Sequence, residues 1–561
     1  MKKLINDPRH VVREMLEGQM LLHARQALLE SENVVVRADL PADPHLRPVA
    51  LISGGGSGHE PAHAGYVGAG MLSAAVVGDV FTSPSVDAVL CAIRCVAGPR
   101  GAILIVKNYT GDRLNFGLAA EMATAEGIPT EVVVVADDVA LRDTVEPERR
   151  RGIAGTVFVH KIAGAAAAEG MDRAAVLSHA RGAAAAVGTM GVALGSCTVP
   201  AAGKPGFSLG EDEMELGLGI HGEQGVARAR LQPVDGIVDT IIDRIVDDKE
   251  LKPGSRVALL VNGLGGTPPM ELAIAARRAL RTLAARGIGV ERAWAGEFMT
   301  ALEMPGLSLS LIALDDRRLA LLDGAADAPA WPGDGVVAAD RIVADRAVAA
   351  TARTAAPGPL AGRLKAAGLA VAQALDENEA FLTELDSRAG DGDLGISMAR
   401  GAAAIRALPA ESWANPAVAL AGIGHAMRRA IAGSSGPFYA TALLRAAREV
   451  GEETPDDHAW ATAFSRAVAS VGELGGAKPG DRTMLDALQP AADAFAAAID
   501  RGRPLGEAWR DAVKAAEDGA EATVTMRPRL GRAAYLGDRA LGSPDAGASA
   551  VLVWMRALAR P

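Results

Sequence analysis

The chain has 561 residues, 49% of them hydrophobic but only 3% aromatic, and a formal net charge of −11 at pH 7. A single hydrophobic core does not extend over this length, so we expect about two to four domains. Nucleic acid is not an expected partner, because phosphate backbones are bound by concentrated basic surfaces and no run of Lys or Arg occurs here. A small phosphorylated ligand remains compatible with a local site.

Cysteine usage and the first residues indicate where the chain resides. Cys91, Cys95 and Cys197 are too few, and odd in number, for a disulfide framework. The first residues include lysines but no apolar segment, so we expect no signal peptide and a cytoplasmic protein. Residues 182–203 are uncharged, but Ala, Gly, Thr and Ser dominate them and Pro200 interrupts them. We therefore expect a packed helix followed by a loop there, and no membrane partner.

Between about residues 45 and 320, short β-rich apolar runs alternate with Ala-rich amphipathic segments. The runs span 49–52, 102–106, 131–136, 257–261 and 309–314. This alternation predicts an α/β region whose strands are largely parallel and buried. Such folds bind ligands in the loops that follow the carboxyl ends of strands. We therefore expect ligand-binding loops at 53–63, 107–112 and 262–267.

Residues 53–63 combine four glycines with His59, Glu60, Pro61 and His63. The segment could cradle phosphate with backbone N–H groups, or it could bring the backbone close to a small substrate. The spacing His-Glu-x-x-His is that of a zinc-protease helix, but Pro61 disfavours the regular helix that would place both histidines on one face. No Gly-Lys-Ser/Thr follows the glycines, so a Walker-type loop is not predicted. A structural turn with structural histidines is the remaining alternative.

Two further segments place reactive side chains beside glycines. Lys107 and Asp112 flank the loop after the second predicted strand, where a carboxylate can accept a hydroxyl proton or simply stabilise a turn. His221 lies among the glycines of 217–223, which indicates either close approach by a small molecule or a structural histidine. Three such segments in one region favour a substrate site.

The composition and periodicity of the sequence change after about residue 325. Ala, Asp, Pro and Gly without sustained periodicity predict a linker up to residue 358. Beyond it, β-branched runs nearly vanish and helical periodicity recurs, which predicts an all-helical domain of about eight helices. The helical segments are 360–385, 397–407, 416–432, 439–451, 458–474, 483–501, 505–520 and 544–559.

Three carboxylates, Asp386, Asp391 and Asp393, lie close together on a Gly-rich turn between two helical segments. Hard oxygen ligands in this arrangement suit Mg²⁺ held together with substrate phosphates, whereas helix capping by Asp393 is the simpler alternative. The turn does not match an EF-hand loop. Gly/Ser-rich turns elsewhere in the domain open or interrupt helices, and together with the aspartates they suggest a nucleotide pocket at one end of the bundle. These turns span 432–436, 475–484 and 543–547.

Taken together, these segments resemble the ATP-dependent dihydroxyacetone (glycerone) kinase family. Its motifs are matched in order at 54–66, 107–112, 151–161, 219–223 and 475–486. The resemblance implies an α/β substrate-binding K domain with two α/β subdomains over 1–325 and a linker over 326–358. It implies an all-α, eight-helix barrel-like L domain over 359–561 that binds ATP and Mg²⁺. It also implies a homodimer, in which the L domain of one chain covers the K domain of the other.

The resemblance implies roles residue by residue. His221 matches the histidine that adds to the substrate carbonyl to give a covalent hemiaminal. His59 and Asp112 match the residues that contact and activate the hydroxyl, with Asp112 as the base. Further ketose contacts are implied for Gly56, Ser57, Gly58 and Lys107, and Mg²⁺ ligands for Asp386, Asp391 and Asp393. The implied nucleotide contacts are Asp393, Leu394, Gly395, Ile396, Ser434, Ser435, Gly475, Thr483, Met484, Asp545 and Gly547.

The leading prediction is an ATP-dependent kinase that phosphorylates dihydroxyacetone or a four-carbon ketose such as erythrulose. Hemiaminal formation selects a ketone or aldehyde over glycerol, since an alcohol has no carbonyl for His221 to attack. The resemblance carries two alternatives: a lyase that cyclises FAD-type ribonucleotides (an FMN cyclase), and a sugar-sensing protein that acts on a transcription regulator. The aspartate set favours catalysis, because a sensor needs no paired metal ions.

Overall fold

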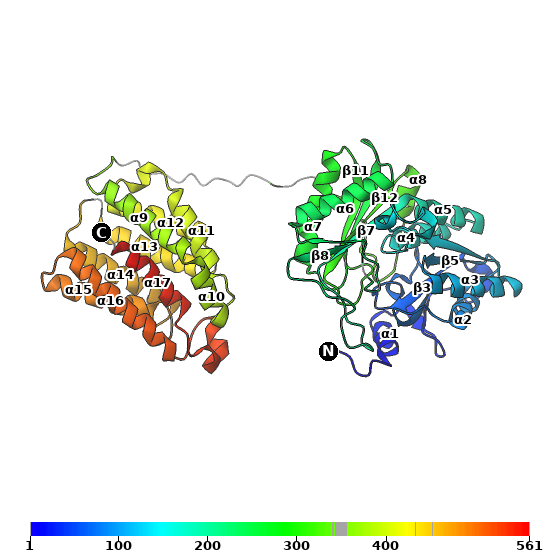
Figure 1. Cartoon of the computed structure of the whole chain (residues 1–561), viewed down its shortest axis with the longest axis horizontal. Helices are drawn as coiled ribbons and strands as arrows, with labels where there is room; N and C mark the ends of the chain where they lie inside the picture. The colour runs from blue at the N-terminus through cyan, green and yellow to red at the C-terminus, as the bar shows by residue number, and fades with distance from the viewer. Residues whose placement is uncertain are drawn as a thin grey trace. The chain divides into compact units, whose positions relative to one another are not determined.

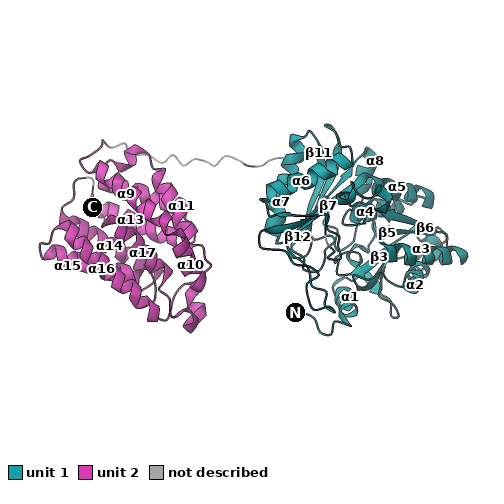
Figure 2. Ribbon diagram, viewed as in Figure 1, with its two compact units in different colours: residues 1–343 teal, residues 344–561 magenta. Residues whose placement is uncertain are grey.

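The structure, a computed structural model, describes residues 2–223, 225–338, 342, 356–431, 433–451 and 453–559. The chain divides into two compact units, residues 1–343 and residues 344–561, which Figure 2 draws in two colours. Within the described residues, unit 1 contains two β-sheets with helices around them and unit 2 is built from helices (Figure 1). This confirms the expected fold class, an α/β region with two subdomains followed by an all-helical region.

In the described part of unit 1, the first sheet contains six strands: β1 (Gln26–Leu28), β2 (Val34–Arg37), β3 (Ala50–Ser57), β4 (Ala74–Val80), β5 (Ala102–Lys107) and β6 (Thr130–Val135). Their order is β1-β2-β4-β3-β5-β6. β3 is parallel to β4 and β5, and β5 is parallel to β6, whereas β1 and β2 form an antiparallel edge. Because neighbouring parallel strands end at the same edge of a sheet, Ser57 and Lys107 come out at the same edge.

The second sheet of the described part of unit 1 also contains six strands: β7 (Val187–Ala193), β8 (Glu213–Leu216), β9 (Ala227–Arg230), β10 (Arg256–Gly263), β11 (Gly289–Gly296) and β12 (Gly306–Ala313). Their order is β11-β10-β12-β7-β8-β9, and only β10 and β11 are parallel. The expectation of largely parallel strands is therefore wrong for this sheet. Helices cover both faces of this sheet, so the sequences of β10 and β12 are largely apolar. This pattern is the one that is typical of buried parallel strands.

Helices flank both sheets, and in the described part of unit 1 they are α1 (Val11–Leu22), α2 (Val86–Val96), α3 (Thr110–Ala125), α4 (Thr156–Ala168), α5 (Arg173–Ala186), α6 (Val234–Asp248), α7 (Pro269–Ala285) and α8 (Asp316–Asp323). Alternate residues of β3 point to opposite faces, so Ile52 packs with α2 and α3 while Leu51 joins the apolar cluster of α4. That cluster also contains Leu260 of β10, which places α4 between the sheets. α4 is accordingly buried from Thr156 to Ala167. α6 and α7 cover the outer face of the second sheet.

Residues 182–203 form the end of α5, the strand β7 and a loop, so the expectation of a helix followed by a loop is wrong. All seven residues of β7 are buried, and β7 pairs with β12. Val187, Thr189 and Val192 are β-branched, a property that favours the extended chain once the alanine run has ended. Among the described residues, no helix combines the length and apolar character that a membrane span requires.

The expected linker, 326–358, is described only in part, because residues 339–341 and 343–355 lie outside the described residues. Its first residues pack on unit 1. The N–H of Ala330 donates to the carbonyl of Gly65 at 2.9 Å, and the rings of Trp331 and Trp294 lie 4.8 Å apart. These contacts bury apolar surface of the segment against unit 1. Composition alone does not distinguish a segment that packs in this way from a linker.

Unit 2 contains, within the described residues, nine α-helices: α9 (Ala361–Glu377), α10 (Glu379–Ala389), α11 (Leu394–Arg406), α12 (Pro416–Ala430), α13 (Ser435–Val450), α14 (Asp457–Gly475), α15 (Leu485–Asp500), α16 (Leu505–Ala522) and α17 (Ala546–Leu558). α9, α11, α12, α13, α14, α15, α16 and α17 contact one another in sequence, and α17 returns to α9. This closed ring agrees with the expected eight-helix, barrel-like domain.

The ninth helix, α10, comes from a segment that we expected to be one helix, 360–385. The helix is interrupted at Asn378, whose backbone dihedral angles (φ −110°, ψ 12°) leave the helical region. The Nδ2 of Asn378 donates to the carbonyl of Ala374 at 2.8 Å. Leu375 and Leu382 are buried on either side of the break, so the apolar spacing continues through it. The periodicity therefore could not reveal the break. α10 contacts α11 and the short helix η7 (Arg532–Ala540).

Candidate active site

The glycines of the 53–63 segment belong to a strand for most of their length, not to a loop as expected, because β3 continues through Ser57. A Cβ atom built on Gly55 would lie 2.4 Å from the Nζ of Lys107. Glycine is therefore needed for the lysine to cross the strand this closely. The Oγ of Ser57 is buried and has no hydrogen-bond partner among the described residues.

Phe81 is the neighbour that the next two glycines accommodate. A Cβ built on Gly56 would lie 2.7 Å from the Cα of Phe81, and one built on Gly58, which has φ +94°, would lie 2.8 Å from its Cε1. Phe81 itself has φ +58°, a left-handed conformation that costs a bulky residue about 1–3 kcal/mol. No sequence motif includes position 81, so the sequence analysis missed this residue.

The imidazoles of His59 and His221 meet edge to face, with ring centroids 4.9 Å apart. The ring of Phe81 stacks on His59 at 5.1 Å and lies edge-on to His221 at 5.3 Å. Tyr109, which follows the predicted Lys107, contacts His221 at 4.5 Å. The structure thus brings the two predicted histidines together and surrounds His221 with three aromatic rings.

The protonation state of His59 follows from its contacts. Its Nδ1 lies 2.8 Å from the carbonyl of Thr300, which can only accept, so Nδ1 carries the proton. The Nε2 atom is then unprotonated, and it is buried without a hydrogen-bond partner among the described residues. Burial holds the pKa of His59 well below its usual value. Burial also lowers the pKa of His221, while the nearby carboxylate of Glu223 opposes that shift.

Lys107 and Asp112 lie together at the carboxyl edge of the first sheet. Lys107 ends β5 and is fully buried, and its Nζ lies 3.9 Å from the Oδ2 of Asp112 in the first turn of α3. Burial lowers the pKa of Lys107, and the charge of Asp112 opposes the decrease. The hydroxyl of Ser83, which no motif identified, donates to the Oδ1 of Asp112. The predicted base thus has an ammonium on one side and a hydroxyl on the other.

An arginine fixes the loop that carries His221. The Nη2 of Arg151 donates to the carbonyl of Gly217 at 2.6 Å and pairs with the carboxylate of Asp138 at 2.7 Å. Its Nη1 lies 3.6 Å from Glu223, whose other oxygen accepts from the backbone N–H of His221 at 2.8 Å. Burial raises the pKa of Asp138 to about 7, although Arg151 opposes the increase. Both ends of the His221 loop are therefore tied to one guanidinium.

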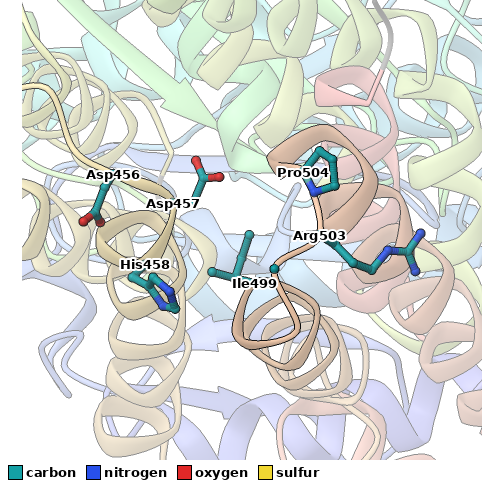
Figure 3. A pocket seen from close by; sticks show the side chains of 7 residues that line it. Asp456, Asp457, His458, Ile499, Arg503 and Pro504 are labelled. Carbon is teal, nitrogen blue, oxygen red and sulfur yellow. The ribbon is translucent and has the colours of Figure 1, made fainter.

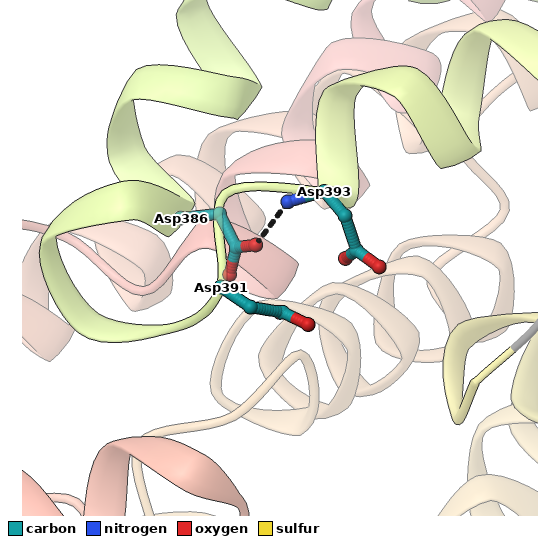
Figure 4. A group of neighbouring side chains, drawn as sticks. All are labelled: Asp386, Asp391 and Asp393. Carbon is teal, nitrogen blue, oxygen red and sulfur yellow. Dashed lines mark hydrogen bonds between the residues drawn. The ribbon is translucent and has the colours of Figure 1, made fainter. Parts of the chain in front are cut away.

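The three predicted metal ligands lie close together (Figure 4), with Asp386 in the last turn of α10 and Asp391 and Asp393 on the turn that leads into α11. Asp386, Asp391 and Asp393 each offer an oxygen, and these oxygens lie within 4.8 Å of one another. The Oδ2 of Asp386 also accepts from the backbone N–H groups of Asp393 (3.0 Å) and Leu394 (3.3 Å). Asp393 makes no side-chain cap on α11, so the simpler capping explanation is wrong. A set of carboxylate oxygens at this spacing fits Mg²⁺.

The predicted nucleotide residues, apart from Gly475, share a position at or next to a helix N-terminus. They are Asp393, Leu394, Gly395 and Ile396 at α11, Ser434 and Ser435 at α13, Thr483 and Met484 at α15, and Asp545 and Gly547 at α17. A Cβ on Gly547 would lie 3.6 Å from the Cβ of Met484, so the starts of α15 and α17 touch. Gly475 ends α14 beside Phe438 in the first turn of α13. Unpaired N–H groups at helix N-termini attract phosphate.

Arg482 ties two of these helix starts together, although the sequence analysis did not single it out. The residue is buried and has φ +60°. Its Nη2 donates to the carbonyls of Ala540 (2.7 Å) and Ser543 (2.9 Å), and its Nε donates to the carbonyl of Thr523 (3.2 Å). These carbonyls precede α17, whereas Arg482 precedes α15. Burial raises the pKa of Asp545, the residue that caps α17, to about 6, and Arg482 opposes the increase.

A surface pocket of about 510 Å³ lies in unit 2 away from these residues (Figure 3). Asp456 and Asp457 at the start of α14 line it together with Arg503, which follows α15 and already pairs with Asp511. α15 has 16 residues and is about 24 Å long, so the pocket lies at the opposite end of this helix from Met484. Its two aspartates make it a poor site for nucleotide phosphates.

Comparisons with known proteins cover the whole chain. A Dak1 domain model matches residues 17–330 and a DAK2 domain model matches residues 388–560. The chain is 42% identical to triokinase/FMN cyclase from Homo sapiens, with 99% of this chain and 98% of that protein covered. It is 37% identical to D-erythrulose kinase from Mycolicibacterium smegmatis, with 100% and 98% covered.

A solved structure has the same two-part architecture. The crystal structure of the dihydroxyacetone kinase from C. freundii in complex with AMP-PNP and Mg²⁺ matches with a TM-score of 0.64 and 36% identity. The match covers 100% of this chain and 99% of that one. Because the Dak1 model spans more than half of the chain and relatives above 30% identity extend over nearly all of it, the resemblance is confirmed. The chain belongs to the dihydroxyacetone kinase family, with a Dak1 domain followed by a DAK2 domain.

Proposed function

We propose that this chain is an ATP-dependent kinase that phosphorylates a hydroxyl of dihydroxyacetone, or of a four-carbon ketose such as erythrulose. One observation carries the proposal. Two buried polar atoms of the Gly-rich segment, the Oγ of Ser57 and the Nε2 of His59, have no partner among the described residues, and the ring of His59 lies against that of His221. Buried polar groups are nearly always hydrogen-bonded in folded proteins, so these atoms mark the place of a small polar ligand.

His221 is proposed to capture the ketose covalently. Burial lowers the pKa of its imidazole, which keeps the ring neutral at pH 7 and leaves a nitrogen lone pair for the carbonyl carbon. As the N–C bond forms, the carbonyl π pair moves to oxygen, which takes up a proton and becomes a hydroxyl. The ring releases the proton of its other nitrogen. Glycerol lacks the carbonyl that this step requires.

Asp112 and His59 are proposed to handle the proton of the reacting hydroxyl. Asp112 is held by Ser83 and faces the Lys107 ammonium, so its carboxylate is fixed in place as an acceptor. The Nε2 of His59 is a second acceptor, because the contact with Thr300 leaves its lone pair free. A base positioned in this way typically contributes about 10²–10⁴-fold to a reaction rate.

The aspartates of unit 2 are proposed to hold the phosphoryl donor. Asp386, Asp391 and Asp393 would bind Mg²⁺ together with the phosphates of ATP, and the helix starts at Ser435, Met484 and Asp545 would offer backbone N–H groups to phosphate oxygens. When bound, the magnesium nucleotide supplies the phosphoryl group and neutralises the charge that develops on it. The C. freundii relative, solved with AMP-PNP and Mg²⁺, supports this assignment.

We further propose that the protein acts as a cytoplasmic homodimer. Phosphoryl transfer requires the donor and the hydroxyl to come within about 3–3.5 Å of each other, so a ketose site on one unit and a nucleotide site on the other must meet. In the proposed dimer they meet between two copies of the chain. The sparse, odd set of cysteines supports a reducing compartment.

An ATP-coupled assay over dihydroxyacetone, both enantiomers of erythrulose and glycerol tests the proposed function. We expect turnover of the ketoses and at least a roughly hundredfold lower kcat/KM for glycerol, because glycerol cannot form the hemiaminal. Equal turnover of glycerol and dihydroxyacetone would contradict covalent capture by His221. Retention of the normal ketose KM in His221→Ala would contradict it independently.

Mixing two inactive variants tests the proposed dimer. His221→Ala removes the ketose-capturing group and Asp391→Asn removes a metal ligand, so each variant alone should be inactive. A mixed dimer that works across the two chains combines the intact ketose site of one variant with the intact nucleotide site of the other. We expect activity to reappear after the variants are unfolded and refolded together. Failure to recover any activity, with the dimer confirmed by light scattering, would argue against transfer between chains.

A second candidate function is the FMN cyclase reaction, which the name of the human relative includes. The aspartate cluster of unit 2 is the site for it, since this cluster fits a divalent ion. Incubation with FAD and Mn²⁺ should give AMP and the cyclic form of FMN, and this reaction should depend on Asp391 but not on His221. Loss of cyclase activity in His221→Ala would place this reaction elsewhere. The aspartates also remain the reason for preferring catalysis over a purely sugar-sensing role.

A further inference from the structure

The second histidine of the Gly-rich segment, His63, has no part in the proposed reaction, yet it is only 3% exposed. Its Nε2 lies 2.8 Å from the Nζ of Lys107, and its Nδ1 lies 3.5 Å from the Oγ of Ser53. His63 therefore connects the sheet interior to a lysine that is expected to contact the ketose. This contact also explains why the apparent zinc-protease spacing contains a second histidine.

The hydrogen-bond directions in this group can be assigned from its chemistry. An ammonium has donors only, so the Nε2 of His63 must accept from Lys107 and its Nδ1 must carry the proton. That proton faces the Oγ of Ser53, whose own hydroxyl donates to the carbonyl of Ile105 at 2.6 Å. The serine thereby favours the tautomer in which Nε2 accepts. Burial, with a further contribution from the charge of Lys107, holds the pKa of His63 well below its usual value, so the ring stays neutral.

Lys107 has few other ways to satisfy its charge. Its side chain is 0% exposed. Its Nζ donates to the carbonyl of Gly54 at 3.2 Å, and the carboxylate of Asp112 lies at 3.9 Å, beyond ordinary hydrogen-bond distance. A buried charge is costly unless it is hydrogen-bonded. The imidazole of His63 is therefore the closest acceptor that the described residues offer to this ammonium.

We propose that His63 is a positioning residue whose Nε2 keeps the Lys107 ammonium charged and in place beside Asp112. The catalytic consequence rests on the proposed kinase function, because Lys107 matters to the reaction as a proposed ketose contact and as the ammonium beside the proposed base, Asp112. The hydrogen bond itself does not depend on that function. Ser53 acts through His63 by selecting its tautomer.

The groups around Lys107 come from several elements. Asp112 of α3 is, among the described residues, the carboxylate within 4 Å of Nζ. The remaining titratable neighbours are histidines: His59 and His63 after β3, His160 of α4 and His221 after β8, and burial lowers the pKa of each. These rings are neutral at basic pH. None of these histidines therefore contributes to a titration seen at basic pH.

Three variants separate the hydrogen bond from simple packing. His63→Leu removes the acceptor but keeps a side chain of similar size, whereas His63→Gln puts back an amide oxygen that can reach Lys107. His160→Leu is the matched control, because the His160 ring packs 5.1 Å from the His63 ring but neither of its nitrogens has a hydrogen-bond partner among the described residues. Should His63→Leu fail to fold, Ser53→Ala tests the same contact by removing the tautomer partner.

The deciding measurement is the titration of Lys107 in the full-length chain. Lysine labelled with ¹³C at the ε carbon is followed by NMR against pH, and the Lys107 signal is identified by its loss in Lys107→Arg. A hydrogen bond to the charged form favours that form, so losing it lowers the pKa. We expect the midpoint to fall by about one pH unit or more in His63→Leu, to fall less in Ser53→Ala, to recover in His63→Gln and to stay unchanged in His160→Leu.

Steady-state kinetics give the second readout. In His63→Leu we expect kcat/KM for the ketose to fall about ten- to hundredfold and its basic limb to move to lower pH, with partial recovery in His63→Gln. If the parent protein is an active kinase and the Lys107 midpoint is unchanged in His63→Leu, the positioning role of His63 is wrong and the proposed function stands. If the parent protein is inactive but the Lys107 midpoint still depends on His63, the proposed function is wrong and the contact between His63 and Lys107 is supported.

Discussion

The carboxylate of Asp112 accepts a hydrogen bond from the hydroxyl of Ser83, which lies in the loop before α2, and Asp112 lies in the first turn of α3. The helices α2 and α3 pack side by side on the first sheet. The hydroxyl occupies one carboxylate oxygen, so the second oxygen is the one that remains for a substrate hydroxyl. The orientation of the proposed base thus depends on a residue outside every motif.

Ser83→Ala should impair the reaction without unfolding the chain. A hydrogen bond to a charged group contributes about 1.5–3 kcal/mol, so we expect kcat/KM for the ketose to fall about tenfold or more. Ser85→Ala is the matched control, because the Ser85 hydroxyl caps α2 at the backbone N–H of Ala88 and has no contact with Asp112. That change should cost about 1 kcal/mol of stability and leave kcat/KM unaltered. Equal rates for Ser83→Ala and the parent would contradict the role of Ser83.

Asp391→Asn should separate ketose binding from phosphoryl transfer. Loss of one carboxylate from the Asp386, Asp391 and Asp393 group weakens the Mg²⁺ site, so we expect kcat to fall at least about a hundredfold. Calorimetry with dihydroxyacetone in the absence of nucleotide should show unchanged binding. Asp456→Asn, in the surface pocket of the same unit, should alter neither quantity. Loss of ketose binding in Asp391→Asn would contradict the division of the two sites between the units.

The sequence identified residues that the structure brings together at the proposed ketose site, but not the side chains around them. Parallel strands end at the same edge of a sheet, so the end of β3 with His59 and the end of β5 with Lys107 had to lie close together. Phe81 and Ser83 could not be found in this way, because they reach the site through a loop with no recognisable pattern. The glycines at positions 56 and 58 make room for Phe81, but the presence of glycines in a sequence does not reveal which side chain they accommodate.

The limits on predicting the fold have a related cause. Apolar periodicity reports which side chains are buried, and β10 and β12 are buried on both faces whether they run parallel or not. It likewise continues from Leu375 to Leu382 across the break at Asn378. Strand direction and helix ends depend on long-range pairing and on local hydrogen bonds, and a single sequence shows neither directly.

His160 should make unit 1 less stable at mildly acidic pH. The side chain is fully buried, and burial lowers its pKa from 6.5 to about 3. The unfolded chain therefore binds a proton that the folded chain does not, and stability is lost as the pH falls from about 6.5 towards 3. His160→Leu removes this loss. Relative to the parent, its free energy of unfolding should rise by about 1.4 kcal/mol between pH 7.5 and pH 5.5.

Urea unfolding of both proteins at the two pH values measures this difference. The comparison with the parent matters, because other groups act in the opposite direction. Burial raises the pKa of Asp138 to about 7, so this carboxyl binds its proton more tightly in the folded chain and favours folding as the pH falls. That contribution is common to both proteins and cancels. A stability difference that is the same at pH 7.5 and pH 5.5 would mean that folded His160 accepts the proton.

Arg482 should matter for both the stability of unit 2 and the nucleotide site. Its guanidinium donates to carbonyls of Thr523, Ala540 and Ser543, so Arg482→Met leaves three buried acceptors without this donor and should cost about 3–5 kcal/mol. Arg482→Lys should recover less than half of this loss, because one ammonium cannot reproduce a planar fork.

Since Arg482 holds the segment before α17 against the loop before α15, we expect the KM for ATP to rise about tenfold in Arg482→Lys while the ketose KM stays constant. Arg503→Lys, at an exposed ion pair, should change stability by less than about 1 kcal/mol and leave both KM values unchanged. Unchanged ATP KM in a folded Arg482→Lys protein would restrict Arg482 to a structural role.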